Sequence, residues 1–374
     1  MKQLSIMLKP ASSACNLRCK YCFYADLAGK RDTFSFGRMD MQTVDRILPN
    51  VFGGLEPGDR VTIAFQGGEP TLVGLDWYRQ FVEKTEKARN GHPVEYALQT
   101  NGTLLDDAWC EFLREHGFLV GLSIDGTPKT HNACRVDIDG AGTYNRVLQT
   151  LHLLKKHQVE FNVLCTLTAQ VARHPQQIWN WIRENDLRFV QFTPCMDELG
   201  KLGASPYALT PERFASFYTQ LFPMWLREFQ QDNYYSIKLF DDIVNLLAYG
   251  VPTACGIDGQ CRPQVIVESD GSVYPCDFYC LDEYRTGNLQ ETPLEELQKA
   301  PQVRAFLTRP RERTELCNSC PYLRICGGGC CHRMQNQVCW VPGGKSCGYR
   351  SFLDSSLNTF LQIAAQQRAM QRRG

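Results

Sequence analysis

The stretch Cys15-Asn16-Leu17-Arg18-Cys19-Lys20-Tyr21-Cys22 decides how the rest of the chain is interpreted. It closely follows the β-type run Leu4–Lys9, so its three cysteines are expected in the loop that leaves the first strand. Three thiolates this close together can hold three irons of a four-iron cubane cluster, whose protein ligands are normally four cysteines. The fourth iron would then be open to another ligand. A structural zinc ion would need four protein ligands, and no further Cys or His lies near this loop in the sequence.

The composition narrows the class of protein. The chain has 374 residues and a net charge of zero, from 40 basic and 40 acidic residues. This balance argues against a nucleic-acid binder, which usually carries a basic surplus. No apolar run approaches the ~18 residues of a membrane helix, and the first ten residues lack the pattern of a signal peptide. We therefore expect a cytoplasmic protein, in which 18 cysteines indicate metal ligation or catalysis before disulfides.

Residues 1–235 alternate between short β-type runs and amphipathic helical patterns. Strands are expected at Leu4–Lys9, Val61–Gln66, Val94–Thr100, Phe118–Ile124, Phe161–Leu167 and Phe189–Thr193. The helices between them are expected at Met41–Val51, Leu75–Arg89, Asp106–His116, Thr143–His157 and Pro175–Asn185. Six strand–helix units in series predict an α/β fold, a partial parallel (β/α)6 TIM-like barrel. Such barrels place their chemistry at the C-terminal ends of the strands, where the cysteine loop lies.

The pattern changes after Gly250, where the density of cysteines rises and helical periodicity fades. Val265–Glu268 and Ser272–Tyr274 flank an Asp-Gly pair, which predicts a β-hairpin. The segment Pro211–Gly250 is expected to be helical and connective, and Ser351–Arg373 predicts a C-terminal helix. We therefore predict two domains, a barrel over residues 1–235 and a metal-organised domain with a C-terminal helix over residues 236–374.

Eight further cysteines have ligand-like spacing, namely Cys255, Cys261, Cys276, Cys317, Cys320, Cys326, Cys330 and Cys347. Eight thiolates are enough for two more four-iron clusters, and the alternative is a pair of zinc-ribbon-like sites. Of the seven cysteines that remain, Cys110, Cys165 and Cys195 lie in apolar stretches and are expected to be small buried side chains. Cys331 adjoins Cys330 and Cys339 precedes Cys347, so either could replace a neighbouring ligand.

The cysteine loop, with Tyr21 before its last cysteine, resembles the signature of the radical S-adenosylmethionine enzymes. The resemblance implies that the open iron binds S-adenosylmethionine and that the reduced cluster cleaves it to methionine and a 5′-deoxyadenosyl radical. Gln66-Gly67-Gly68-Glu69-Pro70, after the second strand, is similar to the element that receives the methionine ammonium group in that superfamily. The cofactor contacts implied are Tyr21, Gly67, Gly68, Glu69, Gln99, Ser123 and Arg135.

The C-terminal cysteine array resembles the SPASM extension of the radical enzymes. The resemblance implies a first auxiliary cluster on Cys255, Cys261, Cys276 and Cys330. It implies a second on Cys317, Cys320, Cys326 and Cys347. Together with the cluster of the N-terminal loop, this makes three 4Fe-4S clusters.

Residues 65–72, 98–104 and 267–279 are similar to stretches of anaerobic sulfatase-maturating enzymes. The similarity implies oxidation of an active-site Cys or Ser of an unfolded or nascent sulfatase to Cα-formylglycine, after the adenosyl radical abstracts a Cβ hydrogen. It also implies that Asp277 is the base, and that Tyr24 and Gln66 lie near the substrate peptide. A low-potential electron donor of the flavodoxin or ferredoxin type is implied as a partner, and no nucleic acid or membrane is expected.

Two other interpretations stay open at this point. Another SPASM enzyme, for example one that forms thioether crosslinks in a ribosomal peptide, would have the same fold. Such enzymes often carry an N-terminal recognition domain, whereas this chain reaches its cysteine loop by residue 15, which favours the sulfatase interpretation. The third interpretation is a zinc-stabilised binding module without enzymatic activity. The sequence alone leaves open whether the target residue is Cys or Ser.

Overall fold

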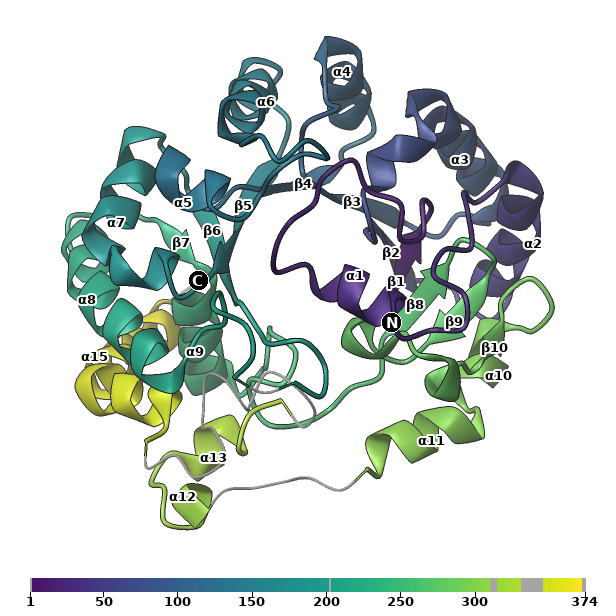
Figure 1. Cartoon of the computed structure of the whole chain (residues 1–374). Coiled ribbons are helices and arrows are strands. Elements are labelled where there is room, and N and C mark those ends of the chain that lie inside the picture. Colours follow the sequence, from purple (N-terminus) through teal and green to yellow (C-terminus); the bar gives the residue numbers. More distant parts are fainter. Residues whose placement is uncertain (1, 202, 310–314, 331–345, 372–374) are drawn as a thin grey trace. The chain divides into compact units, whose positions relative to one another are not determined.

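The computed structural model describes residues 2–201, 203–309, 315–330 and 346–371 (Figure 1). The chain divides into two compact units that interleave along the sequence. Unit one comprises Met1–Ser123, Asn132–Phe161 and Pro263–Arg309. Unit two comprises Ile124–His131, Asn162–Arg262 and Pro310–Gly374. Within the described ranges, every helix is too short or too polar to cross a lipid bilayer.

Unit one is built on a mostly parallel sheet. Its strands β1 (Gln3–Lys9), β2 (Arg60–Phe65), β3 (Val94–Thr100) and β4 (Leu119–Ser123) pair in chain order, all parallel. The other edge of β1 pairs in parallel with β8 (Val265–Glu268). β9 (Ser272–Tyr274) and β10 (Gly287–Asn288) then follow in antiparallel order. Because parallel strands end at the same edge of a sheet, the segments that follow β1, β2 and β8 meet there.

The helices of unit one lie along the outside of these strands in Figure 1. They are α2 (Met41–Phe52), α3 (Leu75–Ala88), α4 (Asp107–Glu115) and α6 (Tyr144–Lys156). The side chains of Asp40 and Asp106 cap α2 and α4 by accepting a hydrogen bond from a first-turn N–H group. Phe65, at the end of β2, is fully buried among aromatic side chains, in contact with the rings of Trp77, Tyr78, Phe81 and Phe118.

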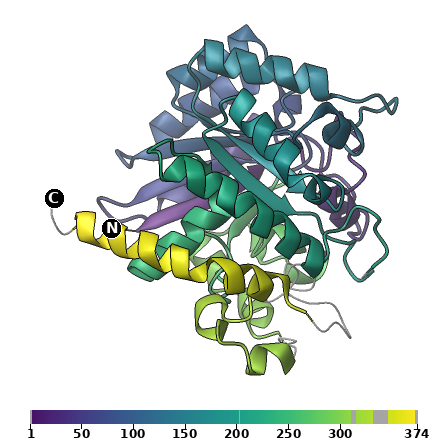
Figure 2. The same cartoon turned by 90° about the vertical axis from the view of Figure 1, so that its left-hand side faces the viewer.

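Unit two contains three parallel strands, β5 (Phe161–Leu167), β6 (Phe189–Pro194) and β7 (Ser236–Ile237). Its longer helices are α7 (Pro175–Glu184), α8 (Pro211–Phe229), α9 (Lys238–Tyr249) and α15 (Gly348–Gln371). The C-terminal helix α15 packs along α8 and α9, as Figure 2 shows. Aromatic rings fill this interface, including those of Phe222, Phe240, Phe352 and Phe360.

The six strands and five helices predicted for the barrel are confirmed, each to within one residue at either end. The hairpin of β8 and β9 is confirmed at its predicted bounds, and the C-terminal helix begins slightly earlier than predicted, at Gly348. Cys110, Cys165 and Cys195 are buried, as predicted. The predicted boundary after residue 235 stays a prediction, because the compact units follow a different division of the chain.

The aromatic core of unit one predicts a large effect for Phe65→Ala. Removing a fully buried ring leaves a cavity, so we expect the free energy of unfolding to fall by about 3–5 kcal/mol. Guanidinium titration of the anaerobic protein measures this. Phe34→Ala is the matched control, because Phe34 is 56% exposed, and it should change stability by no more than ~0.5 kcal/mol. Equal effects of the two substitutions would contradict the packing described.

Candidate active site

The N-terminal cysteine loop lies between β1 and the short helix α1 (Phe23–Ala28). The Sγ atoms of two of its cysteines accept hydrogen bonds from backbone N–H groups: Cys15 from Leu17 at 3.4 Å, and Cys22 from Ala25 at 3.4 Å. Asn101 Nδ2, from the segment after β3, lies 3.9 Å from Cys15 Sγ. Hydrogen bonds to sulfur are a normal part of an iron–sulfur site, so the surroundings of Cys15 and Cys22 fit that role. The complete set of three cysteine ligands stays a prediction.

The Gly67-Gly68 pair lies directly against the cysteine loop. A Cβ atom added to Gly68 would lie 2.0 Å from the backbone oxygen of Ala14, so only glycine fits there. Gly67 has a φ of 123°, a conformation that favours glycine. The contact is held by hydrogen bonds from Gly68 N to Ser12 O at 2.8 Å and from Glu69 N to Ala14 O at 2.8 Å. The two predicted cofactor-binding elements therefore form one packed structure.

The carboxylate of Glu69 is fully buried and is hydrogen-bonded to its own chain. It accepts bonds from Thr71 N at 3.1 Å, Thr71 Oγ1 at 2.6 Å, Thr100 Oγ1 at 2.7 Å and Asn101 N at 2.7 Å. Burial raises the pKa of this carboxyl group above its ordinary value, although the hydrogen bonds oppose that shift. Glu69 thus ties the end of β2 to the end of β3.

The remaining predicted cofactor contacts also lie in unit one. Gln99 Nε2 donates a hydrogen bond to Ser123 Oγ at 3.0 Å, which joins the ends of β3 and β4. The guanidinium group of Arg135 lies over the ring of Tyr21, 5.5 Å from its centroid. Backbone bonds from Arg18 N to Val136 O and from Lys20 N to Cys134 O hold the Arg135 segment against the cysteine loop.

Asp277 lies in the short helix η3 (Asp277–Tyr279), which follows the hairpin. Two side chains hold its carboxylate. Lys9 Nζ lies 2.6 Å from Oδ1, and Gln66 Nε2 donates a hydrogen bond to Oδ2 at 3.2 Å. Sequence reasoning found Asp277 and Gln66 but missed Lys9. The signal available was a lysine directly after the apolar run Ile6-Met7-Leu8, shortly before the cysteine loop.

A second buried ion pair lies beside the first. Glu268, at the end of β8, accepts hydrogen bonds from the Tyr24 hydroxyl, from Arg31 Nη1 at 2.8 Å and from Ser12 Oγ at 3.1 Å. The hydroxyl of Tyr24 therefore points to Glu268, while the face of its ring lies 3.6 Å from Lys9 Nζ. Burial raises the pKa of Tyr24 well above its ordinary value. The placement of Tyr24 near a peptide stays a prediction.

Four of the C-terminal cysteines lie around one pocket in unit two. Its lining includes Cys317, Cys320, Cys326 and Cys347, which is the complete set predicted for the second auxiliary cluster. Burial raises the pKa of the Cys326 thiol to about 11. Four thiols lining one pocket are a donor set that fits a four-iron cluster.

The four cysteines predicted to ligate the first auxiliary cluster are brought together only in part. A Cβ atom on Gly256 would lie 2.7 Å from Cys330 Cβ, so the segment that follows Cys255 lies directly against Cys330. Cys255, Cys261 and Cys330 belong to unit two and Cys276 to unit one, and their assignment to one cluster stays a prediction. Cys331 and Cys339 lie outside the described residues.

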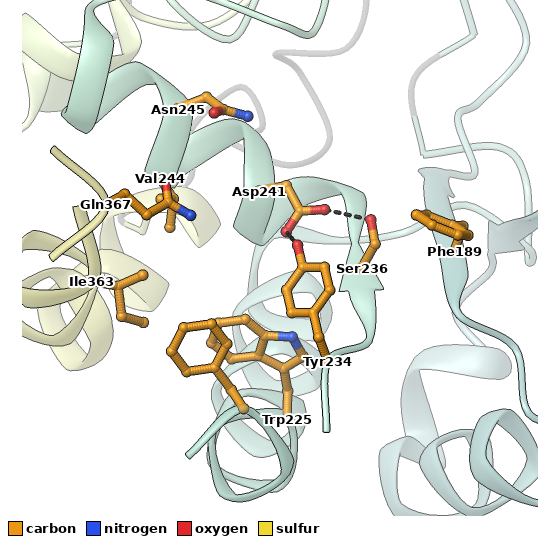
Figure 3. Close-up of a pocket in the computed structure, with 10 residues that line it drawn as sticks. Phe189, Trp225, Tyr234, Ser236, Asp241, Val244, Asn245, Ile363 and Gln367 are labelled. Carbon is orange, nitrogen blue, oxygen red and sulfur yellow. Dashed lines mark hydrogen bonds between the residues drawn. The ribbon is translucent and has the colours of Figure 1, made fainter. Parts of the chain in front are cut away.

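A separate pocket of about 270 Å³ lies in unit two, between the start of β6 and the helices α8, α9 and α15 (Figure 3). Its walls combine aromatic side chains, such as Trp225 and Phe229, with polar ones, such as Asn245 and Gln367. The carboxylate of Asp241 accepts hydrogen bonds from the hydroxyl groups of Tyr234 and Ser236. None of the site residues predicted from the sequence lines this pocket.

Known proteins and family models resemble this chain over most of its length. Residues 10–171 match the Radical SAM superfamily model, and residues 255–321 match the SPASM iron-sulfur cluster-binding domain. The cysteine-type anaerobic sulfatase-maturating enzyme of Clostridium perfringens (strain ATCC 13124) is 41% identical, over 97% of this chain and 99% of its own. The serine-type enzyme of Klebsiella pneumoniae is 30% identical, over 93% of this chain and 86% of its own.

A solved structure of native anSMEcpe with bound AdoMet and Cp18Cys peptide is also similar to this chain. Its TM-score is 0.88 at 36% identity, and the match covers 97% of this chain and 99% of that chain. The predicted fold class, a partial (β/α)6 barrel with a C-terminal SPASM domain, is confirmed by the family models and by this match.

The contact between Gly68 and Ala14 predicts that Gly68→Ala displaces the cysteine loop, because backbone atoms cannot move as cheaply as a side chain. We expect anaerobically reconstituted protein to fall from about twelve irons per chain to about eight, the loss of one cubane. Iron and sulfide analysis measures this. Gly54→Ala is the matched control, because its added Cβ would be 3.9 Å from the nearest atom named there, Glu295 Oε2. Full iron content in Gly68→Ala would be the contrary result.

Proposed function

The chain belongs to the anaerobic sulfatase-maturating enzymes of the radical S-adenosylmethionine superfamily, and from this we propose how its own residues carry out the reaction. The reaction oxidises a Cys or Ser of a sulfatase to Cα-formylglycine, with three 4Fe-4S clusters and S-adenosylmethionine as cofactors. The observation that carries the proposal is the position of Asp277. Its carboxylate is fixed between Lys9 and Gln66, where three loops of unit one meet.

We propose that the target residue is cysteine. The cysteine-type relative from Clostridium perfringens is 41% identical to this chain, and the serine-type relative from Klebsiella pneumoniae is 30% identical. Both matches cover more than nine tenths of this chain, so the difference in sequence identity does not arise from the length of the aligned region. The substrate is a sulfatase polypeptide that is unfolded or nascent, because the side chain to be oxidised has to reach a largely buried carboxylate.

The cysteine loop and the Gly67-Gly68 turn are proposed to hold the radical-generating cluster and its cofactor. Cys15, Cys19 and Cys22 would be the iron ligands, and the cofactor would contact Tyr21, Gly67, Gly68, Glu69, Gln99, Ser123 and Arg135. Because the Glu69 carboxylate already accepts four hydrogen bonds, the backbone of this turn is the better acceptor for an ammonium group. When bound, these groups and the auxiliary clusters supply the 5′-deoxyadenosyl radical that removes the Cβ hydrogen and accept the electron that leaves the substrate.

Asp277 is proposed to be the base of the reaction. The substrate loses one hydrogen atom from Cβ, one proton from sulfur and one electron, which leaves a C=S double bond. Water then replaces sulfur, so hydrogen sulfide leaves and the aldehyde remains. A carboxylate can accept the sulfur proton if it lies within hydrogen-bond reach. Gln66, which donates a hydrogen bond to the same carboxylate, is proposed to bind the peptide beside it. Tyr24 contributes to this site through its ring, next to Lys9.

The C-terminal cysteines complete the proposed cofactor set. Cys255, Cys261, Cys276, Cys317, Cys320, Cys326, Cys330 and Cys347 would ligate the two auxiliary clusters. The thiols of Cys317, Cys320, Cys326 and Cys347 already line one pocket. The electrons that start each turnover would come from a low-potential flavodoxin or ferredoxin. We place the enzyme in the cytoplasm, where such donors and reduced thiols are available.

The proposed specificity predicts a mass change confined to one residue. Incubation of the reduced, iron-loaded protein with S-adenosylmethionine and a Cys-containing sulfatase peptide should convert that Cys to an aldehyde, as tandem mass spectrometry can show. The same peptide with Ser at the target position should react more slowly. Loss of two hydrogens shared between two residues would instead identify a crosslinking enzyme, and faster turnover of the Ser peptide would contradict the cysteine assignment.

The role of Asp277 predicts that Asp277→Asn slows formylglycine formation by ~10²–10⁴-fold, the usual contribution of a positioned base. Cleavage of S-adenosylmethionine should persist, because the substitution leaves the N-terminal cysteine loop intact. Liquid chromatography of 5′-deoxyadenosine and peptide product measures both. Asp76→Asn on α3 is the control, since the side chain of Asp76 is 86% exposed. Unchanged turnover in Asp277→Asn would rule out the proposed base.

A further inference from the structure

We propose that Lys9 is a positioning residue that holds the Asp277 carboxylate in the orientation needed to take the sulfur proton of the substrate. This inference rests on the proposed role of Asp277 as the base. Lys9 is the last residue of β1, and its side chain is completely buried. No contact of Lys9 with substrate or cofactor is required, because its action on the reaction passes through Asp277.

Three groups surround the ammonium group of Lys9. Oδ1 of Asp277 lies 2.6 Å from Nζ, Sγ of Cys280 lies 3.6 Å away, and the centroid of the Tyr24 ring lies 3.6 Å away. Nζ donates a hydrogen bond to Cys280 Sγ, forms an ion pair with Oδ1 of Asp277 and lies over the face of the Tyr24 ring. These contacts leave the ammonium group little room to move. Burial alone disfavours the charged form, but the neighbouring Asp277, Cys280, Tyr24 and Glu268 outweigh it, so the pKa of Lys9 is raised.

The carboxylate of Asp277 is thereby held at both oxygens. Lys9 binds Oδ1, and Gln66 donates to Oδ2 at 3.2 Å. The backbone N–H of Asp277 also donates to Gln264 Oε1 at 3.3 Å. The side chain of Asp277 keeps 9% of its surface exposed while that of Lys9 keeps none. The accessible part of the ion pair therefore belongs to the carboxylate, which is the side from which a peptide can approach.

The support behind Lys9 is itself fixed. The hydroxyl of Tyr24 is bound by Glu268, and Glu268 is held by Arg31 and Ser12. The Arg31–Glu268 pair has side-chain exposures of 0% on both sides. The hydroxyl group of Tyr24 is thus held by a hydrogen bond, and the face of its ring packs against Lys9. This arrangement places the ammonium group by packing as well as by charge.

Loss of the Lys9 side chain should affect one step of the reaction and leave another unchanged. Abstraction of the Cβ hydrogen needs no base, so it should continue without Lys9. The next step breaks the S–H bond, sends the proton to the Asp277 carboxylate and forms the C=S bond. The one electron released in this step would pass to the auxiliary iron–sulfur clusters. A carboxylate that is free to rotate accepts that proton less often. Cofactor cleavage should then be uncoupled from product, and the ratio of 5′-deoxyadenosine to formylglycine should rise.

The test is Lys9→Met, which keeps the length of the side chain and removes its charge. The expected result is a ~10- to 100-fold fall in formylglycine formation, the scale of a misplaced catalytic group. The rate of 5′-deoxyadenosine formation should stay near that of the unmodified enzyme, and KM for the Cys peptide should change by less than ~3-fold, because peptide binding is not the step affected. Lys84→Met is the matched control, since it breaks another Lys–Asp pair with a 2.6 Å contact, on the surface.

A double-mutant cycle with Asp277→Asn separates this role from a merely structural one. If Lys9 acts through Asp277, Lys9→Met should have little further effect on the product ratio in the Asp277→Asn protein. A product ratio in Lys9→Met equal to that of the unmodified enzyme would overturn the proposal, as would an equal loss in both backgrounds. If Lys9→Met does not bind its iron, Lys9→Arg, which keeps the charge but changes the geometry, is judged by the same ratio.

The same experiment distinguishes failure of the positioning role from failure of the proposed function. If Asp277→Asn uncouples the reaction and Lys9→Met does not, the base is confirmed and only the role of Lys9 is lost. If Asp277→Asn keeps the ratio of the unmodified enzyme, the base itself is wrong, and the role of Lys9 is overturned with it.

Discussion

Strand β1 is hydrogen-bonded in parallel on both of its edges, to β2 and to β8, and the rest of the site depends on this pairing. Parallel strands end at a common edge, so the pairing brings together segments that are far apart in the sequence. Lys9 and Glu268 are register partners at that edge, and Gln66 follows the end of β2. The cysteine loop, the glycine turn and the Asp277 helix are therefore all placed by the same backbone ladder.

Much of this could be predicted from the sequence because the signals are local. Apolar strands, helix periodicity and the Asp-Gly turn each depend on residues that are close in the chain, and the strands, helices and hairpin that they predicted are present. The pairing of β8 with β1 leaves no such signal, since a buried strand shows only that it has neighbours, and not which ones. Lys9 was missed for the same reason, because its partners Asp277 and Cys280 lie far from it in the sequence, 271 positions away in the case of Cys280.

Two buried ion pairs of unit one contribute more to the arrangement of the site than to the stability of the fold. Replacing a buried ion pair by apolar residues is often neutral or stabilising, by about 1–4 kcal/mol, whereas removing one partner costs about 3–5 kcal/mol. Two such pairs, Lys9–Asp277 and Arg31–Glu268, lie side by side around Tyr24. Each joins a residue near the start of the chain to strand β8 or to the helix η3 that follows the hairpin. The two ion pairs determine which side chains face each other at the end of β1.

The contact between Gly68 and Ala14 also has an evolutionary consequence. At Gly68 the two loops touch through backbone atoms, because the atoms nearest to an added Cβ belong to the backbone of Ser13 and Ala14. Drift in one loop is therefore constrained by the shape of the other, and the two should vary together among relatives. Grafting the cysteine loop into a different scaffold would fail unless the glycine turn were carried with it. The cysteine loop after β1 and the glycine turn after β2 therefore have to be inherited together.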